Sequence, residues 1–308
     1  MPGPPLLVSV PVPDLREALS DRPDGVDVIE WSMEGPAPTD VIDIVVPPYL
    51  GQLPTLARLA AVRTRLIQSQ LVGYDGVTDA LPPGHVFANA ASVHETSTAE
   101  LTLALILASQ RGIPDFVRAA QEGRWARAEH PSLADRTVLL VGYGGVGRAI
   151  ESRLLAFETT VIRVARSARI DERGVIHAID ELDELLPLAD IVVVVVPLSP
   201  ETTHLIDDEF LTRMNDGALL VNVARGPVAD TEALLAHAGS RRLRLALDVT
   251  DPEPLPQGHP LFAMTNVLIS PHVGGATNAM LPRMARLLRE QIDRLLRGDE
   301  PINVVLRS

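Results

Sequence analysis

The sequence contains no cysteine and few aromatic residues. Without cysteine, disulfide bonds, thiolate nucleophiles and cysteine-ligated metals are excluded, and we expect no metal site. Phe, Trp and Tyr make up only 3% of the 308 residues, so the core must consist mainly of aliphatic side chains. No apolar run approaches the roughly 20 residues that span a bilayer, and the N-terminus lacks the features of a signal peptide. We therefore expect a cytoplasmic protein without a membrane partner.

Positive charge is also in short supply. Lys and Arg together number 27 against 40 Asp and Glu residues, which gives a net charge of −13. Such a surface repels the phosphate backbone of nucleic acids, so we expect no nucleic-acid partner. An anionic substrate requires a locally positive site. A chain of this length corresponds to about two domains.

Short apolar runs alternate with helical segments along the chain, which predicts parallel strands joined by helices. Strands are expected at residues 6–10, 26–31, 41–46, 65–70, 137–141, 159–166, 191–196, 218–224, 244–250 and 266–271. Near-continuous Val, Ile and Leu in the later runs indicate strands buried on both faces. A long apolar helix, with Ser97 or Thr98 as N-cap and Gly112 as its stop, can join two domains.

We therefore expect an α/β protein of two domains. Residues 98–277 form a Rossmann-type dinucleotide-binding domain. Residues 1–97, completed by 278–308, form a smaller flavodoxin-like α/β substrate domain.

The stretch "VGYGGVGRAI", residues 141–150, follows an apolar strand and opens a helix. In such a loop Gly142 permits the tight turn, Gly144 lets the backbone approach a pyrophosphate, and Gly147 allows close packing of helix on strand. The helix N-terminus then offers unpaired N–H groups to the phosphates. The strand–turn–helix context predicts dinucleotide binding, whereas the alternative is a plain structural turn. The predicted contacts are Gly142, Tyr143, Gly144, Gly145, Val146 and Gly147.

The next strand ends with Ala165, where NAD-binding loops usually carry an acidic residue that binds the ribose 2′-hydroxyl. Arg166, Ser167 and Arg169 follow, and guanidinium and hydroxyl groups can bind a 2′-phosphate. The sequence therefore predicts that NADP is preferred and NAD is possible. The alternative is a solvated basic loop.

Three later residues follow strands of the same predicted sheet: Arg225, Glu253 and His272. Ligands of open α/β sheets bind outside the carboxyl ends of the strands, so these side chains are expected to converge near the dinucleotide. The motifs "VGYGGVGRAI", "PLSPETTHLID", "LLVNVARGPVADTEAL", "ALDVTDPEPLP" and "SPHVGGAT" occur in this order. In these motifs the chain resembles the D-isomer-specific 2-hydroxyacid dehydrogenase family, over about residues 66–277.

The resemblance implies reversible hydride transfer from NAD(P)H to a 2-oxo acid, giving a D-2-hydroxy acid, as in glyoxylate or hydroxypyruvate reductases. Arg225 would hold the substrate carboxylate and polarise the carbonyl group. His272 would exchange a proton with the substrate oxygen, and Glu253 would orient the imidazole ring. The resemblance also implies a homodimer, assembled through the long apolar helix.

Further contacts come from the resemblance alone. Asp248 is expected near the nicotinamide carboxamide. The other expected coenzyme contacts are Val196, Pro197, Val223, Ala224, Arg225, His272 and Gly274. The expected substrate contacts are Leu71, Val72, Gly73, Arg225 and His272, with backbone N–H groups near Val72 and Gly73 binding the carboxylate.

Two other functions remain open. Some relatives are corepressor-like proteins that sense nucleotides, and others oxidise formate or phosphite. Val72 argues against phosphite oxidation, because the resemblance implies a lysine at this position in the branch of the family that oxidises phosphite. The role of His94 stays open, with a structural role favoured. Residues 45–51 and 70–75 are mostly apolar, which hints at an aliphatic or small substrate side chain.

Overall fold

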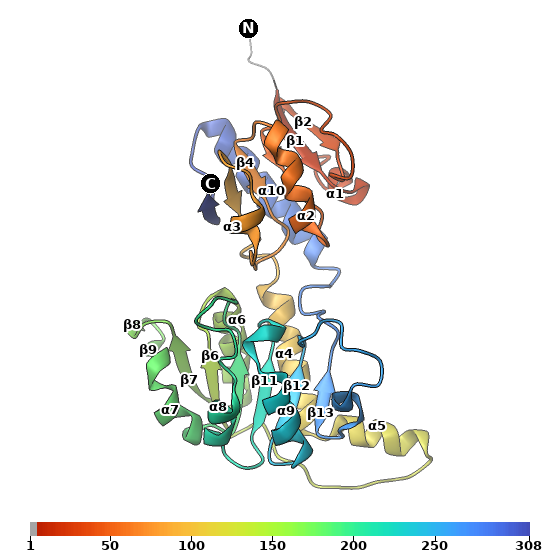
Figure 1. Ribbon diagram of the computed structural model, residues 1–308, viewed down its shortest axis with the longest axis vertical. Helices are drawn as coiled ribbons and strands as arrows, with labels where there is room; N and C mark the ends of the chain where they lie inside the picture. The colour runs from red at the N-terminus through yellow and green to blue at the C-terminus, as the bar shows by residue number, and fades with distance from the viewer. Residues whose placement is uncertain (1–4) are drawn as a thin grey trace. The chain divides into compact units, whose positions relative to one another are not determined.

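The chain divides into two compact units in the computed structural model, which describes residues 5–308 (Figure 1). Unit 1 contains the residues up to His94 together with Thr277–Ser308, and unit 2 is Glu95–Ala276. Residues 1–4, at the start of the expected first domain, lie outside the described residues. The helix that opens unit 2 begins at Glu95, so the N-cap expected at Ser97 or Thr98 was wrong and the first boundary comes three residues earlier than expected.

Unit 1 is built on a six-stranded sheet with the order β14-β5-β4-β3-β1-β2. Neighbouring strands are parallel except for the antiparallel pair of β14 and β5. Without β14, this is the strand order 2-1-3-4-5 of flavodoxin-like sheets. The strands are β1 (Leu6–Val10), β2 (Val26–Glu30), β3 (Ile44–Val45), β4 (Leu66–Gln68), β5 (Val86–Ala88) and β14 (Val304–Arg307). The helices are α1 (Pro13–Glu17), α2 (Gln52–Leu56), α3 (Val77–Ala80) and α10 (Met280–Arg297), with a 3₁₀ helix at Ala57–Ala61.

Apolar side chains cover both faces of the unit 1 sheet. On one face, alternate residues of β1 belong to the same core as α1 and α10. Met284, Leu288 and Ile292 recur at helical spacing on α10 and are fully buried in that core. On the other face, α2 and α3 contribute Leu56 and Val77. The last long helix of the chain therefore packs in unit 1.

Unit 2 contains an eight-stranded sheet with the order β13-β12-β11-β10-β6-β7-β9-β8. Neighbouring strands are parallel except for the antiparallel pair of β8 and β9. The strands are β6 (Thr137–Val141), β7 (Thr160–Ala165), β8 (Arg169–Asp171), β9 (Gly174–Ala178), β10 (Ile191–Val194), β11 (Leu219–Asn222), β12 (Arg244–Leu247) and β13 (Val267–Ile269). The direction of strand order reverses between β6 and β10, as in Rossmann sheets.

Helices cover both faces of the unit 2 sheet. The α-helices are α4 (Glu95–Gln110), α5 (Ile113–Gln121), α6 (Gly145–Leu154), α7 (Leu182–Leu185), α8 (Asp208–Arg213) and α9 (Thr231–Gly239). The 3₁₀ helices are Leu155–Phe157, Ile179–Glu181, Leu186–Leu188, Gly226–Val228 and Pro260–Ala263. In β6, Leu139 and Val141 share a core with α7, α8 and α9, whereas Val138 and Leu140 share one with α4 and α6. The expected α/β architecture, with one Rossmann-type unit and one smaller flavodoxin-like unit, is confirmed.

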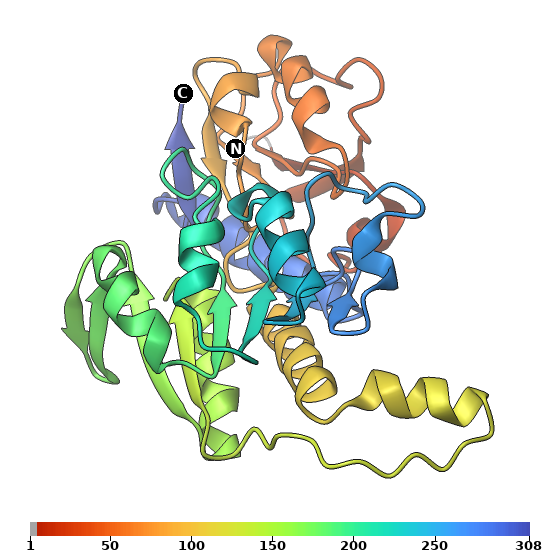
Figure 2. The same cartoon turned by 60° about the horizontal axis from the view of Figure 1, so that its bottom comes forward.

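The segment between α4 and β6 stands out from the layers of unit 2. Figure 2 shows α5 and the long connection that follows it, in yellow, projecting away from the sheet. Ile113 and Val117 of α5 are exposed, and Trp125 in the connection is 97% exposed. Large apolar side chains are therefore available on this projection.

The expected strands form, although most are shorter than expected, and β3 occupies only Ile44–Val45 of the expected 41–46. β5, β8, β9 and β14 were not expected. β8 and β14 lie at sheet edges and carry charged residues, so they lack the continuous apolar run that marks a buried strand.

Candidate active site

The glycine loop connects β6 to α6 at the carboxyl end of β6. A side chain on Gly142 would lie 2.6 Å from the carbonyl oxygen of Val195, and one on Gly147 would collide with the carbonyl oxygen of Gly142. Close packing of the protein on itself therefore requires both glycines. A Cβ on Gly144 would instead meet open space. Because Gly144 directly precedes α6, this space lies where helix N–H groups can bind a pyrophosphate.

The basic segment after β7 lies beside the glycine loop. β7 ends at Ala165, and Arg166 and Ser167, which follow it, are exposed. Arg169 is exposed as well, and it is the first residue of the strand β8. The alternative expectation for this segment was a solvated basic loop. Its guanidinium donates a hydrogen bond to the backbone carbonyl oxygen of Tyr143 at 3.3 Å. This bond ties the segment expected to select the coenzyme to the loop expected to hold the pyrophosphate.

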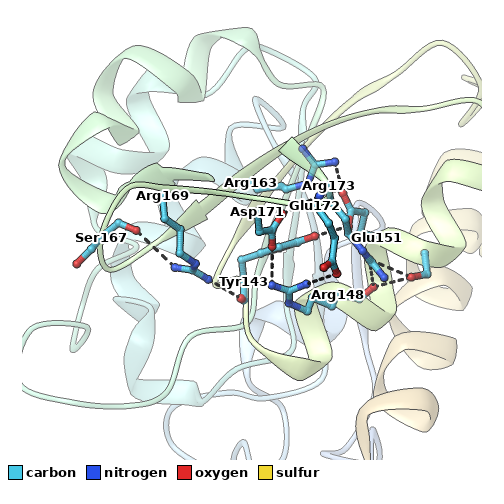
Figure 3. A network of polar contacts seen from close by, with 10 residues as sticks. Tyr143, Arg148, Glu151, Arg163, Ser167, Arg169, Asp171, Glu172 and Arg173 are labelled. Atoms are coloured by element: carbon cyan, nitrogen blue, oxygen red, sulfur yellow. Dashed lines mark hydrogen bonds and ion pairs between the residues drawn. The ribbon is translucent and has the colours of Figure 1, made fainter. Parts of the chain in front are cut away.

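A buried carboxylate strengthens the same connection (Figure 3). Glu151 of α6 accepts hydrogen bonds from the hydroxyl of Tyr143 and from the guanidinium groups of Arg163 and Arg173. Burial by itself raises the pKa of Glu151, but the three donors outweigh it and hold the pKa below its ordinary value. Burial and the adjacent carboxylate raise the pKa of the Tyr143 phenol. At neutral pH a charged acceptor therefore faces a neutral hydroxyl donor.

Arg148 completes this cluster from the first turns of α6. Its guanidinium carbon lies 5.0 Å from the centre of the Tyr143 ring, and it pairs with Asp171 at 2.5 Å and with Glu172 at 3.6 Å. Sequence reasoning missed the whole cluster. The only local sign was the alternation of charges in "RIDER", residues 169–173, which is equally typical of an exposed loop.

The remaining expected residues of unit 2 follow strands at the carboxyl edge of its sheet. Val196 and Pro197 come after β10, and Val223 and Ala224 come after β11. Arg225 follows directly, and its guanidinium donates to the carbonyl oxygen of Ala224 at 2.7 Å. This edge, next to the reversal of strand order between β6 and β10, is where open α/β sheets bind ligands.

Two neighbours shape the loop that carries Arg225. The side-chain amide of Asn222 donates to the carbonyl oxygen of Arg225 at 3.2 Å, and its oxygen accepts from the N–H of Ala224 at 3.0 Å. Gly226 packs so closely that a Cβ there would collide with the carbonyl oxygen of Thr250. The Arg-Gly sequence therefore has a packing reason, because only glycine lets this loop lie against the segment that follows β12.

Asp248 organises the loop that carries His272. Its buried carboxylate accepts hydrogen bonds from the Ser270 hydroxyl at 2.7 Å and from the N–H groups of Val273 and Gly274, both at 2.9 Å. Its carbonyl oxygen accepts from the N–H of His272 at 2.7 Å. Sequence reasoning placed Asp248 near the nicotinamide and did not find this role. The contacts join residues more than 20 positions apart, which no local pattern reveals.

The imidazole of His272 faces the carboxylate of Glu253. The distance from Nδ1 to Glu253 Oε1 is 2.6 Å, and both side chains are partly exposed. His272 has a φ of 52°, in the left-handed region that residues with side chains rarely adopt. The bonds to Asp248 hold the backbone there, and such conformations cluster at functional sites. The pair leaves Nε2 for a proton transfer.

Comparison with known proteins bears on this arrangement. Residues 103–274 match the model of the D-isomer specific 2-hydroxyacid dehydrogenase, NAD binding domain. The chain is 36% identical to the glyoxylate reductase of Thermofilum pendens over 79% of this chain and 75% of that protein. It is 34% identical to the glyoxylate reductase of Korarchaeum cryptofilum over 80% of this chain and 77% of that protein.

A solved structure agrees over nearly the whole chain. The D-isomer specific 2-hydroxyacid dehydrogenase of Xanthobacter autotrophicus Py2, in complex with NADPH and MES, has a TM-score of 0.83 and 30% identity and covers 99% of both chains. The chain belongs to the D-isomer specific 2-hydroxyacid dehydrogenase family. It is accordingly an NAD(P)-dependent oxidoreductase, as its sequence motifs predicted.

The loop expected to bind substrate in this dehydrogenase lies in unit 1, after β4. The N–H of Leu71 donates to the hydroxyl of Ser69 at 3.0 Å, and the carbonyl oxygen of Val72 accepts from the side chain of Asn89 at 2.8 Å. No residue that the structure describes accepts a hydrogen bond from the N–H of Val72 or Gly73. The loop is therefore fixed through other groups, and these two donors stay available to a carboxylate.

His94 lies buried at the end of unit 1. Its Nε2 lies 2.7 Å from the carbonyl oxygen of Gln70, just before the substrate loop, and its ring lies 5.9 Å from that of Tyr49. These contacts support the structural role that was favoured for His94. Within residues 5–308 no helix is long and apolar enough to cross a bilayer, and no three acidic or histidine side chains gather in a way that suits a metal ion.

Proposed function

We propose that this dehydrogenase reduces a 2-oxo acid to the D-2-hydroxy acid and prefers NADPH to NADH. The observation that carries the proposal is the hydrogen-bonded pair of Glu253 and His272 in the same unit as the open glycine loop. Bound NAD(P)H supplies a hydride to the carbonyl carbon. His272 then donates its Nε2 proton to the oxygen that becomes the hydroxyl group, while Glu253 fixes the orientation of the ring.

Arg225 and the loop of unit 1 are assigned to the substrate carboxylate. A guanidinium matches the geometry of a carboxylate, and the free N–H groups of Val72 and Gly73 supply further donors. These groups provide the local positive potential that an anionic substrate needs on a chain with a net charge of −13. Because the relatives include glyoxylate reductases, glyoxylate and hydroxypyruvate are the first substrates to test.

The preference for NADPH is assigned to the segment after β7. Ala165 offers no carboxylate to repel a 2′-phosphate, and Arg166 and Ser167 are exposed beside the glycine loop. One opposing charge lies nearby. The hydroxyl of Ser199 chiefly, and the charge of Arg166 to a lesser degree, lower the pKa of Glu201. The ionised Glu201 attracts Arg166 and weakens its pull on a phosphate, so we expect NADH to be accepted as well.

The decisive experiment measures oxidation of NADPH and NADH with a panel of 2-oxo acids. Turnover with none of them would overturn the enzymatic proposal and favour a nucleotide-sensing protein. His272→Ala should lower kcat by about 10²–10⁴-fold, the usual effect of losing a general acid–base. Coenzyme binding, measured by fluorescence titration, should survive that substitution. A near-normal kcat would remove His272 from the reaction.

Coenzyme selectivity has its own variants. Arg166→Ala should lower the NADPH-to-NADH ratio of kcat/KM by about tenfold, because a charge-assisted hydrogen bond contributes about 1.5–3 kcal/mol before solvent exposure reduces it. Glu201→Gln should raise the ratio, because the competing carboxylate is removed. Arg111→Ala, an exposed arginine after α4, is the matched control and should leave the ratio unchanged. NADH preferred by the unmodified enzyme would contradict the assignment.

We also propose a homodimer. The apolar side chains of α4, expected to form the interface, are mostly buried within unit 2, whereas Ile113, Val117 and Trp125 are exposed on the projecting segment. That segment is the better interface. Light scattering should give twice the chain mass of 33.2 kDa, and Trp125→Ser should reduce it toward a single chain. The cytoplasmic location and the absence of nucleic-acid and membrane partners stay predictions.

A further inference from the structure

Unit 1 contains a cavity at a place where its fold favours ligands. The strand order β2-β1-β3 means that the chain leaves β1 and β3 toward opposite sides of the sheet. Crevices at such reversals, outside the carboxyl ends of the strands, are the usual ligand sites of open α/β sheets. Here the loops after β1 and β3 border a cavity of about 550 Å³. That volume lies within the range of small-molecule sites.

The walls of the cavity are largely apolar. They come from the loop after β1, from α1, from the loop after β3 and from the start of α10. The main apolar contributors are Pro11, Val12, Leu15, Pro48, Leu50, Met280, Leu281 and Met284. Three of these, Val12, Leu50 and Leu281, are exposed, and Leu50 is 81% exposed. Grouped exposed apolar side chains mark binding surfaces, whereas single ones need no explanation.

The charged groups around the cavity are of one sign. Asp14 and Glu34 line it and are both exposed, and none of the lining residues is an arginine or a histidine. The chain contains no lysine, since all 27 of its basic residues are arginines. A ligand group with a negative charge would therefore meet two carboxylates and no compensating cation. The cavity suits an uncharged aliphatic group.

The cavity adjoins the loop assigned to the substrate carboxylate. Gln70 lines the cavity and directly precedes Leu71, Val72 and Gly73. Its side-chain amide donates to the carbonyl oxygen of Pro47 at 2.8 Å, so the loop after β4 is tied to the loop after β3. A 2-oxo acid with its carboxylate on the N–H groups of Val72 and Gly73 would therefore have its side chain next to this wall.

We propose that this cavity receives the side chain of the substrate, and that the favoured substrates are 2-oxo acids with aliphatic side chains of about four carbons. This rests on the proposed reduction of 2-oxo acids. Asp14 and Glu34 reject acids with a second carboxylate. Two substrates of similar size separate the effect of the apolar walls from that of the two carboxylates: 4-methyl-2-oxopentanoate has an apolar end, and 2-oxoglutarate has a charged one.

The test measures kcat/KM with NADPH for glyoxylate, 2-oxobutanoate, 2-oxopentanoate, 4-methyl-2-oxopentanoate and 2-oxoglutarate. From 2-oxobutanoate upward, kcat/KM should rise with each added carbon by about tenfold, the lower end of what one methylene contributes in an apolar pocket. Leu50→Ala should lower the value for 4-methyl-2-oxopentanoate by about tenfold and leave that for glyoxylate unchanged. Val41→Ala, also an exposed apolar residue but outside the cavity, is the control.

The charge argument has a second pair of variants. Glu34→Gln should raise kcat/KM for 2-oxoglutarate several-fold, whereas Glu17→Gln, an exposed glutamate that does not line the cavity, should not. The inference would be overturned if kcat/KM did not change with the length of the substrate side chain, or if Leu50→Ala lowered kcat/KM equally for every acid. Either result would leave the reduction of 2-oxo acids intact. Failure to reduce any acid, glyoxylate included, would instead overturn the proposed function.

Discussion

Replacing Glu151 by Gln should destabilise unit 2 by about 2–4 kcal/mol at pH 7, because removing one partner of a buried ion pair leaves the other uncompensated. The Glu151 carboxylate is fully buried and accepts hydrogen bonds from Tyr143, Arg163 and Arg173. The side chain of Arg163 is 15% exposed and that of Arg173 is 34% exposed. Water can therefore solvate Arg173 in part, so we place the loss below the upper end found for fully buried pairs.

The loss should depend on pH in a definite direction. The pKa of Glu151 is lowered in the folded protein from its ordinary value of 4.5, since its three donors outweigh the effect of burial. A carboxyl whose pKa is lowered on folding adds stability that is fully present above the unfolded value and disappears as the pH falls through the folded value. The difference between the unmodified protein and Glu151→Gln should therefore be full at pH 7 and shrink below pH 4.5.

Amide hydrogen exchange followed by mass spectrometry is the suitable assay, because it reports the opening of β6 and α6 without assuming that both units unfold together. Glu172→Gln is the matched control. Its carboxylate is 81% exposed and lies 3.6 Å from Arg148, so its loss should cost at most about 0.5 kcal/mol. Equal protection of the β6 and α6 amides from exchange in Glu151→Gln and Glu172→Gln at pH 7 would refute the reasoning. So would a difference in stability between the unmodified protein and Glu151→Gln that grows as the pH falls.

Two further predictions concern glycines and the His272 loop. Gly144→Ala should change the free energy of unfolding by no more than about 0.5 kcal/mol, because the added Cβ meets no protein atom. The same Cβ should weaken coenzyme binding, because it enters the space proposed for the pyrophosphate. Gly147→Ala should lower the melting temperature markedly, because its Cβ collides with the backbone. Calorimetry and coenzyme titration measure the two effects. A large loss of stability in Gly144→Ala with none in Gly147→Ala would contradict the assigned roles. Asp248→Asn should lower kcat more than it weakens coenzyme binding, because an amide cannot accept all three hydrogen bonds that hold the His272 loop. Unchanged steady-state rates would show that the loop keeps its conformation without them.

Much of the candidate active site could be predicted from sequence because its elements are local. A glycine loop between an apolar strand and a helix has its own backbone requirements, and residues that follow parallel strands must lie along one edge of the sheet. Arg225 and His272 follow strands at that edge, and the expected hydrogen bond between Glu253 and His272 is present. Their spacing along the chain required no knowledge of packing.

The contacts that support these residues could not be predicted in this way. Glu151 lies on α6 and Arg173 on the turn between β8 and β9, and their pairing depends on how that hairpin folds over the glycine loop. Asp248 and Gly274 are separated by 26 positions and meet only because β12 and β13 are neighbours. Local patterns carry no information about such meetings, since each residue alone is typical of a solvated loop.

By itself, the sequence determined the alternation of most of the buried strands with helices, the dinucleotide loop and the family, because apolar periodicity and turn residues act over a few positions. The tertiary structure alone decided three things. It buried Glu151 among Tyr143, Arg163 and Arg173, it placed the Asp248 carboxylate against the loop that carries His272, and it formed the cavity at the reversal between β1 and β3. Each depends on side chains brought together from distant segments, and folding sets those distances through the burial of a common core.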